Sequence, residues 1–321
     1  MKYFVIAVLL VILEILYFRI ARLLNITDNP NHRSSHTKPT IRGGGVIFPV
    51  AVLVYSLLTG NASWYWVIGL STISFVSFLD DILTLANRAR LIVHVLSVGL
   101  LLYSLSILSF WPILLIVVVY ILIIGTINAW NFMDGINGIT VMYTFSVLIA
   151  LYYFDIKFVF IDIGLISVVA ISTAIFGFFN CRRNAVCFAG DVGSVSLSFI
   201  LIYFILSLII VTGNPIFVLL FAVYGVDSIM TIVYRLSKKE NIFKAHRSHL
   251  YQLMANERKM PHLVVSVIYF IMQMVVNIIL IAIMGLSFST QCLIGVGVIV
   301  LLSAIYWIVR YILVEKVRVA L

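Results

Sequence analysis

Charged residues are scarce in this chain, since Asp, Glu, Lys and Arg together make up only 10% of its 321 residues. Cysteine occurs three times and proline six times. By contrast, 63% of the residues are hydrophobic and the mean hydropathy is +1.18. A soluble domain of this length could not cover so much apolar surface, which excludes a soluble globular fold. The composition predicts an all-α, polytopic integral membrane protein.

Apolar segments long enough to cross a bilayer, which requires about 17–25 residues, recur along the whole chain. Eleven are predicted, at residues 2–21, 43–60, 63–79, 91–109, 111–127, 138–154, 158–179, 192–212, 215–234, 263–285 and 290–313. The first has no small-residue cleavage site, so we interpret it as a retained helix and not a signal peptide. We expect a single transmembrane domain over residues 1–321.

The basic residues are distributed unevenly between the predicted loops. Seventeen lie on one side, against two, Lys2 and Lys157, on the other. Loops rich in Lys and Arg face the cytoplasm, which predicts an outer N-terminus and a cytoplasmic C-terminus. The net charge of +9 reflects this topology, and no basic-aromatic module suggests a nucleic-acid partner. The cysteines form no motif, so we expect free thiols.

Every strongly polar cluster falls on the side predicted to be cytoplasmic. In the segment 128–138, Asn128, Asn131, Asp134 and Asn137 recur every three residues, and a helix would place them on one face. Polar groups at a membrane edge are costly and usually mark a site. Asn, Asp and Gly also form ordinary caps and turns, but four such groups in phase between two apolar spans favour a functional role.

Two adjacent carboxylates, Asp80 and Asp81, end the third predicted span, where the helix dipole disfavours negative charge. Mg²⁺ commonly joins one or two carboxylates to substrate phosphates, so the pair suggests a metal-dependent site. The alternative is a solvated pair that Arg88 or Arg90 neutralises. Asp191, flanked by glycines, could cap a helix, hold a metal beside a phosphate, or do both.

Two further segments carry candidate phosphate-binding groups. Residues 31–45 include Lys38, Arg42 and three consecutive glycines, among them Gly44, whose backbone amides could approach a ligand closely. The alternative is a basic loop with a flexible helix start. In the longest cytoplasmic loop, His246 and His249 lie one helical turn apart beside Arg247, which favours contact with a diphosphate.

Asp227 lies inside the ninth predicted span, where structural and functional roles are equally plausible. Because the ionisable groups gather at one membrane face and not at its middle, an enzyme using a soluble substrate is favoured. A polytopic transporter of an anionic solute, with the carboxylates used for cation coupling, is the alternative.

The motif order resembles the polyprenyl-phosphate N-acetylhexosamine-1-phosphate transferases, the MraY/WecA-like superfamily, also called glycosyltransferase family 4. The resemblance covers roughly residues 20–255 and rests on Asp80-Asp81, Asn128–Gly138, Gly190–Ser194 and His246–Gln252. Residues 33–45 and 246–252 are most similar to the branch that initiates O-antigen synthesis. The chain lacks the consecutive histidines of the peptidoglycan translocases. It also has Thr84 in place of a usual basic residue, for which Arg88 or Arg90 would compensate.

The resemblance implies transfer of an N-acetylhexosamine-1-phosphate from a UDP-sugar to undecaprenyl phosphate, with release of UMP. The UDP-sugar would be of the UDP-FucNAc, UDP-QuiNAc or UDP-GlcNAc type. Mg²⁺, or alternatively Mn²⁺, would serve as cofactor. The enzyme would lie among the lipids of the bacterial inner membrane with its active site on the cytoplasmic face. A homodimer is one alternative for its assembly.

The resemblance also implies a role for each candidate residue. Asp191 and Asp134 would bind the metal, and Asp80 or Asp81 would position or deprotonate the lipid phosphate. Whether transfer takes one step or passes through a covalent aspartyl intermediate stays open. The substrate-binding set comprises Asn128, Asn131, Asn137, Lys38, Arg42, Gly44, His246, Arg247 and His249.

Overall fold

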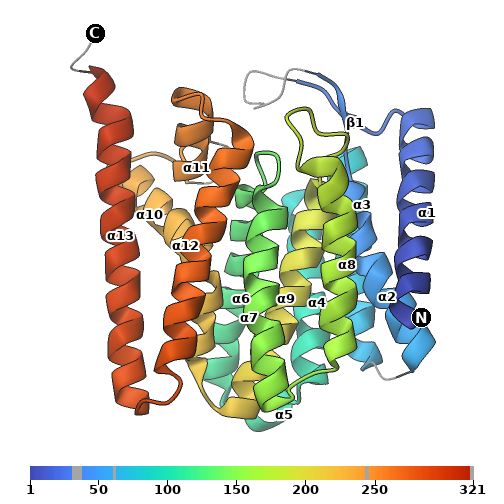
Figure 1. The fold of residues 1–321 in the computed structure, drawn as a ribbon, viewed down its shortest axis with the longest axis horizontal. Coiled ribbons are helices and arrows are strands. Elements are labelled where there is room, and N and C mark those ends of the chain that lie inside the picture. The colour runs from blue at the N-terminus through green and yellow to red at the C-terminus, as the bar shows by residue number, and fades with distance from the viewer. Residues whose placement is uncertain (31–37, 61–62, 243–245, 319–321) are drawn as a thin grey trace.

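Long helices packed side by side form a single bundle in the computed structural model, which describes residues 1–30, 38–60, 63–242 and 246–318 (Figure 1). The first half contains α1 (Lys2–Leu23), η1 (Gly44–Val46), α2 (Ile47–Thr59), α3 (Trp64–Leu83), α4 (Asn87–Ser104), α5 (Ile107–Phe110), α6 (Ile113–Met133) and α7 (Ile139–Phe158). The second half contains α8 (Ile163–Asn180), α9 (Gly190–Thr212), η2 (Pro215–Phe221), α10 (Ala222–Ser237), α11 (Leu250–Gln252), η3 (Leu253–Glu257), α12 (His262–Ile283) and α13 (Phe288–Arg318). The bundle confirms the predicted all-α, polytopic membrane architecture.

Each of the eleven predicted spans contains a helix. Within the described ranges, nine helical stretches are long and apolar enough to cross a bilayer. Of the other two, residues 44–59 are apolar but shorter, and α4 carries Arg88 and Arg90 in its first turn. The predicted boundary between residues 91–109 and 111–127 corresponds to a break in the helices. There, Ser106 has a φ of 59° and Pro112 precedes α6.

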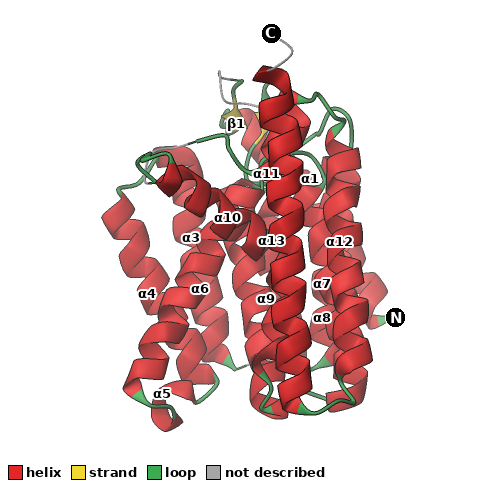
Figure 2. Cartoon of the chain, turned by 90° about the vertical axis from the view of Figure 1, so that its left-hand side faces the viewer, coloured by secondary structure: helices red, strands yellow, loops and turns green. Residues whose placement is uncertain are grey.

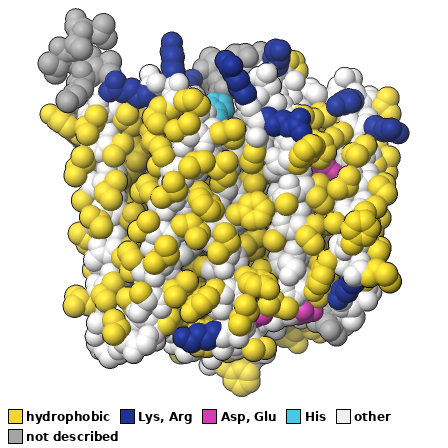
Figure 3. All heavy atoms as spheres, viewed as in Figure 1, with side chains coloured by type: hydrophobic (Ala, Val, Ile, Leu, Met, Phe, Trp, Pro, Cys, Tyr) yellow, Lys and Arg dark blue, Asp and Glu magenta, His cyan; other side chains and the backbone are white. Residues whose placement is uncertain are grey.

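The centre of the bundle is formed by α7 and α9. In each of them, 67% of an apolar stretch of 18 residues is buried inside the protein. In α6 and α13 only 22% of the corresponding stretch is buried, so these helices expose apolar side chains along most of their length. Figure 3 shows such side chains covering the flank of the molecule. This exposed apolar flank is the surface that lipid would cover.

The loops that connect the helices at one end of the bundle include the longest connections, those after α1, α8 and α10 (Figures 1 and 2). They follow α1, α3, α6, α8 and α10, and Figure 3 shows most of the visible Lys and Arg side chains at this end. One of them contains the antiparallel pair of β1 (Thr27–Asp28) and β2 (Thr40–Ile41), with Thr27 opposite Ile41. Their gathering at one end agrees with the predicted grouping of basic loops, while the direction across the membrane stays a prediction.

Candidate active site

The glycine-rich segment 43–45 packs directly against the start of α9. Its amides are used inside the protein, since Gly44 donates to the carbonyl of Phe188 at 2.9 Å and Gly45 to that of Ala189 at 3.0 Å. A Cβ on Gly193 would lie 2.7 Å from the Cα of Gly45, so the two backbones touch where η1 crosses α9. The glycines therefore serve close backbone packing, which fixes the position of Arg42. The predicted ligand contact of Gly44 is untested.

Arg42 links the two acidic motifs. Its Nε atom lies 2.6 Å from Oδ1 of Asp81, and its Nη2 atom lies 3.4 Å from Oδ1 of Asp191. The hydroxyl of Tyr17, from α1, donates to the carbonyl oxygen of Arg42 and fixes its backbone. Three elements distant in the sequence thus bring one guanidinium between two carboxylates.

Asp81 caps a helix to which it does not belong. Its carboxylate accepts hydrogen bonds from the amides of Asp191 at 2.9 Å and Val192 at 3.0 Å, and so satisfies the first turn of α9. Gly190 has a φ of +73°, and a side chain there would overlap Asp81. The alternative that Asp191 caps its own helix is wrong, because α9 begins at Gly190 and Asp191 lies inside the first turn, where Asp81 accepts from the amides of Asp191 and Val192. They are consequently not open to a phosphate either.

Asp80 and its partner Arg90 lie beside this pair. Nη1 of Arg90 is 2.8 Å from Oδ2 of Asp80, and the amide of Leu85 donates to Oδ1 of Asp80 at 2.6 Å. Nη2 of Arg90 also reaches to within 3.9 Å of Asp191. Of the two arginines considered as substitutes for a basic residue at position 84, Arg90 occupies the site and Arg88 is exposed.

Among Asp80, Asp81 and Asp191, the side chain of Asp191 is the most accessible. Its side chain is 20% exposed, against 8% for Asp80 and 0% for Asp81, and both of its arginine contacts are long. The side chain of Asn131, from α6, lies close enough to lower the pKa of the Asp191 carboxyl, against the rise that burial causes. Asp191 is therefore the carboxylate with the most coordination capacity left for a ligand.

The segment 128–138 is only partly helical. Asn128 and Asn131 lie on α6, but that helix ends at Met133, so the prediction of one helical face through residue 137 is wrong for Asp134 and Asn137. The cause is the turn before Gly138, which has a φ of +84°. The Asn128 amide donates to the carbonyl of Ile124 at 2.8 Å, one turn earlier in the helix.

Asp134 still turns toward the acidic cluster. Burial raises the pKa of its carboxyl from an ordinary 3.8 to about 6, and the negative charge of Asp191 adds to the rise, while a hydrogen bond from Thr140 opposes it. Asn137 instead joins two loops, because its side-chain amide donates to the carbonyl of Arg182 at 2.8 Å. Its role in nucleotide binding stays a prediction.

The segment 246–252 docks on the end of α6. The hydroxyl of Tyr251 donates to the carbonyl of Phe132 at 2.7 Å, and Gly135 packs against the Tyr251 ring. The rings of His246 and His249 lie 5.0 Å apart, although not for the expected reason, since the helix α11 begins only at Leu250. The two rings are neighbours because the non-helical segment that precedes α11 brings them together.

The model of glycosyl transferase family 4 matches residues 63–209, which contain all four clustered aspartates. The match is to a transferase family. It supports the resemblance to the MraY/WecA-like superfamily. No curated protein matches the chain at a significant level.

The family match leaves two parts of the site uncovered, Arg42 and the segment 246–252. In that segment, burial, the neighbouring His249 and Arg235 lower the pKa of His246 to about 4, so its ring is neutral at physiological pH. His246 lies 2.9 Å from the Ser248 hydroxyl, and Arg247 is half-buried. The His246 ring therefore offers neutral hydrogen-bonding edges rather than a fixed cation.

Some predicted residues lie at the margin of the described site. Lys38 is exposed at the start of the described stretch that follows residue 37. The motif residues 33–36 fall outside the described residues. Sequence reasoning missed Tyr17 and Tyr251, because a tyrosine that acts through its hydroxyl on a distant carbonyl leaves no local motif.

The carboxylates suit a cation only together with a substrate. In the described part of the chain, no three His, Cys, Asp or Glu side chains are grouped so that they alone could hold a metal ion. Mg²⁺ usually keeps several waters and takes one or two carboxylates plus phosphate oxygens. Asp80, Asp81 and Asp191 contact two guanidiniums, and Asp134 adds a carboxylate close enough to Asp191 to be affected by its charge, so the cluster keeps an excess of negative charge that suits a divalent cation.

Proposed function

We propose that this protein transfers an N-acetylhexosamine-1-phosphate from a UDP-sugar to undecaprenyl phosphate and releases UMP. The observation that carries the proposal is the convergence of Asp80, Asp81 and Asp191 with Arg42 and Arg90 at one end of the bundle. The family match agrees with this chemistry, because it suggests transfer of a phosphosugar to a polyprenyl phosphate. From the positive-inside rule we expect that end to face the cytoplasm, and the resemblance implies a bacterial inner membrane.

The reaction joins two anions. A non-bridging oxygen of the lipid phosphate attacks the β-phosphorus of the UDP-sugar, and the bond from that phosphorus to the oxygen of UMP breaks. Most of the barrier is electrostatic, so the protein has to position the phosphates and offset their charge. Arg42 and Arg90 suit this task, since each is about a third exposed and also contacts the cluster.

The exposure of the carboxylates suggests a division of roles. Asp81, with a fully buried side chain, positions Arg42 and the start of α9. Asp80, which is slightly exposed and paired to Arg90, is the better candidate to accept a proton from the lipid phosphate or to orient it. Asn131 and Asn128 would support the nucleotide side, and His246, Arg247 and His249 the diphosphate or sugar.

Asp191 and Asp134 would hold Mg²⁺ or Mn²⁺, which when bound would neutralise phosphate charge. Asn131 lies beside Asp191, and Thr140 orients Asp134 through a hydrogen bond. The acceptor's isoprenoid tail would lie against the apolar flank of the bundle. The sugar is proposed to be of the UDP-FucNAc, UDP-QuiNAc or UDP-GlcNAc type, in a pathway such as O-antigen initiation.

The proposal is tested with purified protein in detergent, undecaprenyl phosphate, Mg²⁺ and a panel of UDP-N-acetylhexosamines. We expect lipid-linked diphosphosugar to form and radiolabelled UMP to exchange into the UDP-sugar. Asp191→Asn should lower the rate at least about 100-fold while the protein stays folded. Asp162→Asn is the matched control, because Asp162 lies at the start of α8, whereas the site lies beyond the other end of that helix.

Lack of transfer and exchange with every UDP-sugar tested would refute the proposed reaction. If solute uptake into proteoliposomes were seen instead, the transporter alternative would replace it. Full transfer activity in Asp191→Asn would refute the assignment of the metal to that residue.

A further inference from the structure

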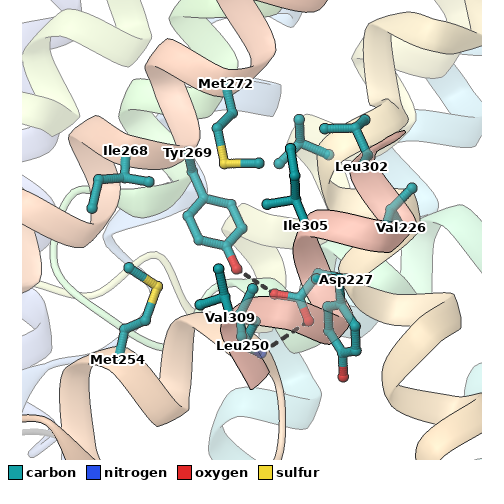
Figure 4. A pocket seen from close by; sticks show the side chains of 12 residues that line it. Val226, Asp227, Leu250, Met254, Ile268, Tyr269, Met272, Leu302, Ile305 and Val309 are labelled. Carbon is teal, nitrogen blue, oxygen red and sulfur yellow. Dashed lines mark hydrogen bonds between the residues drawn. The ribbon is translucent and has the colours of Figure 1, made fainter. Parts of the chain in front are cut away.

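A buried hydrogen-bond network joins α10, α12 and α13 to the segment 246–252. At its centre lies Asp227, whose carboxylate accepts from the Tyr269 hydroxyl, from the Leu250 amide at 3.0 Å and from the Thr231 hydroxyl at 3.1 Å. Figure 4 shows Tyr269 and Leu250 pointing at this carboxylate from two sides. Nδ1 of His249 completes the group at 3.3 Å. All these residues lie outside the family match.

The ring of His249 is held by one edge only. Nδ1 faces Asp227, and a carboxylate can only accept, so Nδ1 carries the proton. Nε2, on the other edge of the ring, is buried and has no hydrogen-bond partner among the described residues. The His249 side chain is only 4% exposed. A buried polar atom without a partner calls for an explanation, such as strain, an ordered water or a group of a bound ligand.

A second contact reaches the same segment from α13. Nη1 of Arg310 donates to the carbonyl of Ser248 at 2.7 Å and to the Tyr306 hydroxyl at 2.7 Å. The guanidinium also stacks on Tyr234, with 3.6 Å from its carbon to the ring centroid. The Tyr306 hydroxyl lies 2.9 Å from that of Thr231, which binds Asp227. Arg310 is therefore joined to His249 both through the backbone and through the network.

An apolar cavity of about 70 Å³ borders this network. Figure 4 shows Met272, Leu302 and Ile305 around it, with Asp227 at its wall. Few polar groups line the cavity, so on that side no further polar side chain adds to the four donors around the Asp227 carboxylate, among which the His249 contact is the longest. Hydrogen bonds to a charged group are stronger in such surroundings than in water. The arrangement suits a fixed ring orientation better than a mobile one.

We propose that Asp227 and Arg310 are positioning residues that fix the tautomer and orientation of His249, so that its Nε2 atom accepts a hydrogen bond from the nucleotide-sugar. This inference rests on the proposed function. In the neutral ring with Nδ1 protonated, Nε2 is an acceptor, and the donors available on a UDP-N-acetylhexosamine are sugar hydroxyls and the acetamido N–H. His249 therefore recognises the sugar rather than the diphosphate.

The tautomer is measured directly by ¹⁵N NMR of protein labelled at histidine, with the His249 signal assigned by its loss in His249→Gln. We expect a protonated Nδ1 and an unprotonated Nε2 in the wild type. Asp227→Asn, which keeps the shape of the side chain, should shift the population toward protonated Nε2. Asp162→Asn is the control, because Asp162 also accepts from a tyrosine hydroxyl and a backbone amide. This readout needs no activity, so it stands apart from the proposed reaction.

The rate measurement separates positioning from stability. Asp227→Asn and Arg310→Lys should each lower kcat/KM for the UDP-sugar about 10- to 100-fold, as removal of a group that orients a histidine commonly does. Arg258→Lys is the control, since Arg258 also donates to a carbonyl, at 2.7 Å, but lies outside the network. An unchanged His249 tautomer in Asp227→Asn would overturn the inference. So would wild-type kcat/KM in both network variants.

Discussion

Replacing Asp81 by asparagine separates the structural carboxylate of the site from the chemical one. Asp81 accepts from Nε of Arg42 at 2.6 Å and from two amides of α9 at 2.9 and 3.0 Å, and its side chain is fully buried. Asparagine has one acceptor oxygen and a donor NH₂ group. At least one of the α9 amides then loses its partner, and Arg42 loses its nearest anion.

The size of the effect follows from these contacts. A buried amide left without an acceptor costs about 1–3 kcal/mol. The Arg42 guanidinium is 33% exposed, so the ion pair adds only about 1 kcal/mol. The sum is about 3 kcal/mol for Asp81→Asn, or roughly 150-fold in the folding equilibrium. Asp191→Asn should cost about 1 kcal/mol or less, because its contacts of 3.4 and 3.9 Å are long.

The two variants are compared by unfolding in mixed micelles and by transfer rate. Both should lose transfer, but only Asp81→Asn should lose stability. Part of the transfer activity lost in Asp81→Asn should be recovered at lower temperature or lower denaturant concentration, because more of the protein is then folded. If Asp191→Asn is destabilised as much as Asp81→Asn, or Asp81→Asn keeps its full stability, the assigned division of roles is refuted.

Three further variants probe other contacts of the site. Arg90→Met should lower transfer at least about 10-fold, measured as initial rate, whereas Arg88→Met should not, because only Arg90 reaches the carboxylates. Gly135→Ala, whose Cβ would overlap the tyrosine hydroxyl of α11, should raise KM for the UDP-sugar several-fold, while Gly125→Ala, with open space at its Cβ, should leave it unchanged. Burial raises the pKa of the Asp134 carboxyl from 3.8 to about 6 in the folded protein. The stability of the wild type relative to Asp134→Asn should therefore fall as the pH rises from about 4 to about 6. A difference in unfolding midpoints that does not change with pH would contradict this.

Much of the fold could be predicted because apolar runs report membrane helices directly, and all eleven predicted spans contain a helix. The grouping of the polar motifs at one end could also be predicted, because successive membrane helices bring every second loop to the same side. The roles inside the cluster could not be predicted. Nothing in the sequence near Asp81 indicates that it caps α9, because the capped amides lie about 110 residues further along the chain.

The segment 246–252 is a second place where the sequence did not predict the local structure. His246 and His249 were paired by helical spacing, and they are neighbours, but an extended turn brings them together. Asp227 was balanced between structural and functional roles. Its partners come from α11 and α12, so only the assembled helices reveal its contact with His249.

The position of Arg42 also has a consequence for biogenesis. A membrane protein enters the bilayer from its N-terminus, and Arg42 precedes Asp81, which in turn precedes α9 by five helical segments. When α3 inserts, the guanidinium has already been synthesised, but the amides of Asp191 and Val192 have not. Arg42 is thus the partner that can accompany the Asp81 charge during insertion, and a chain without it must hold that charge unpaired until α9 arrives.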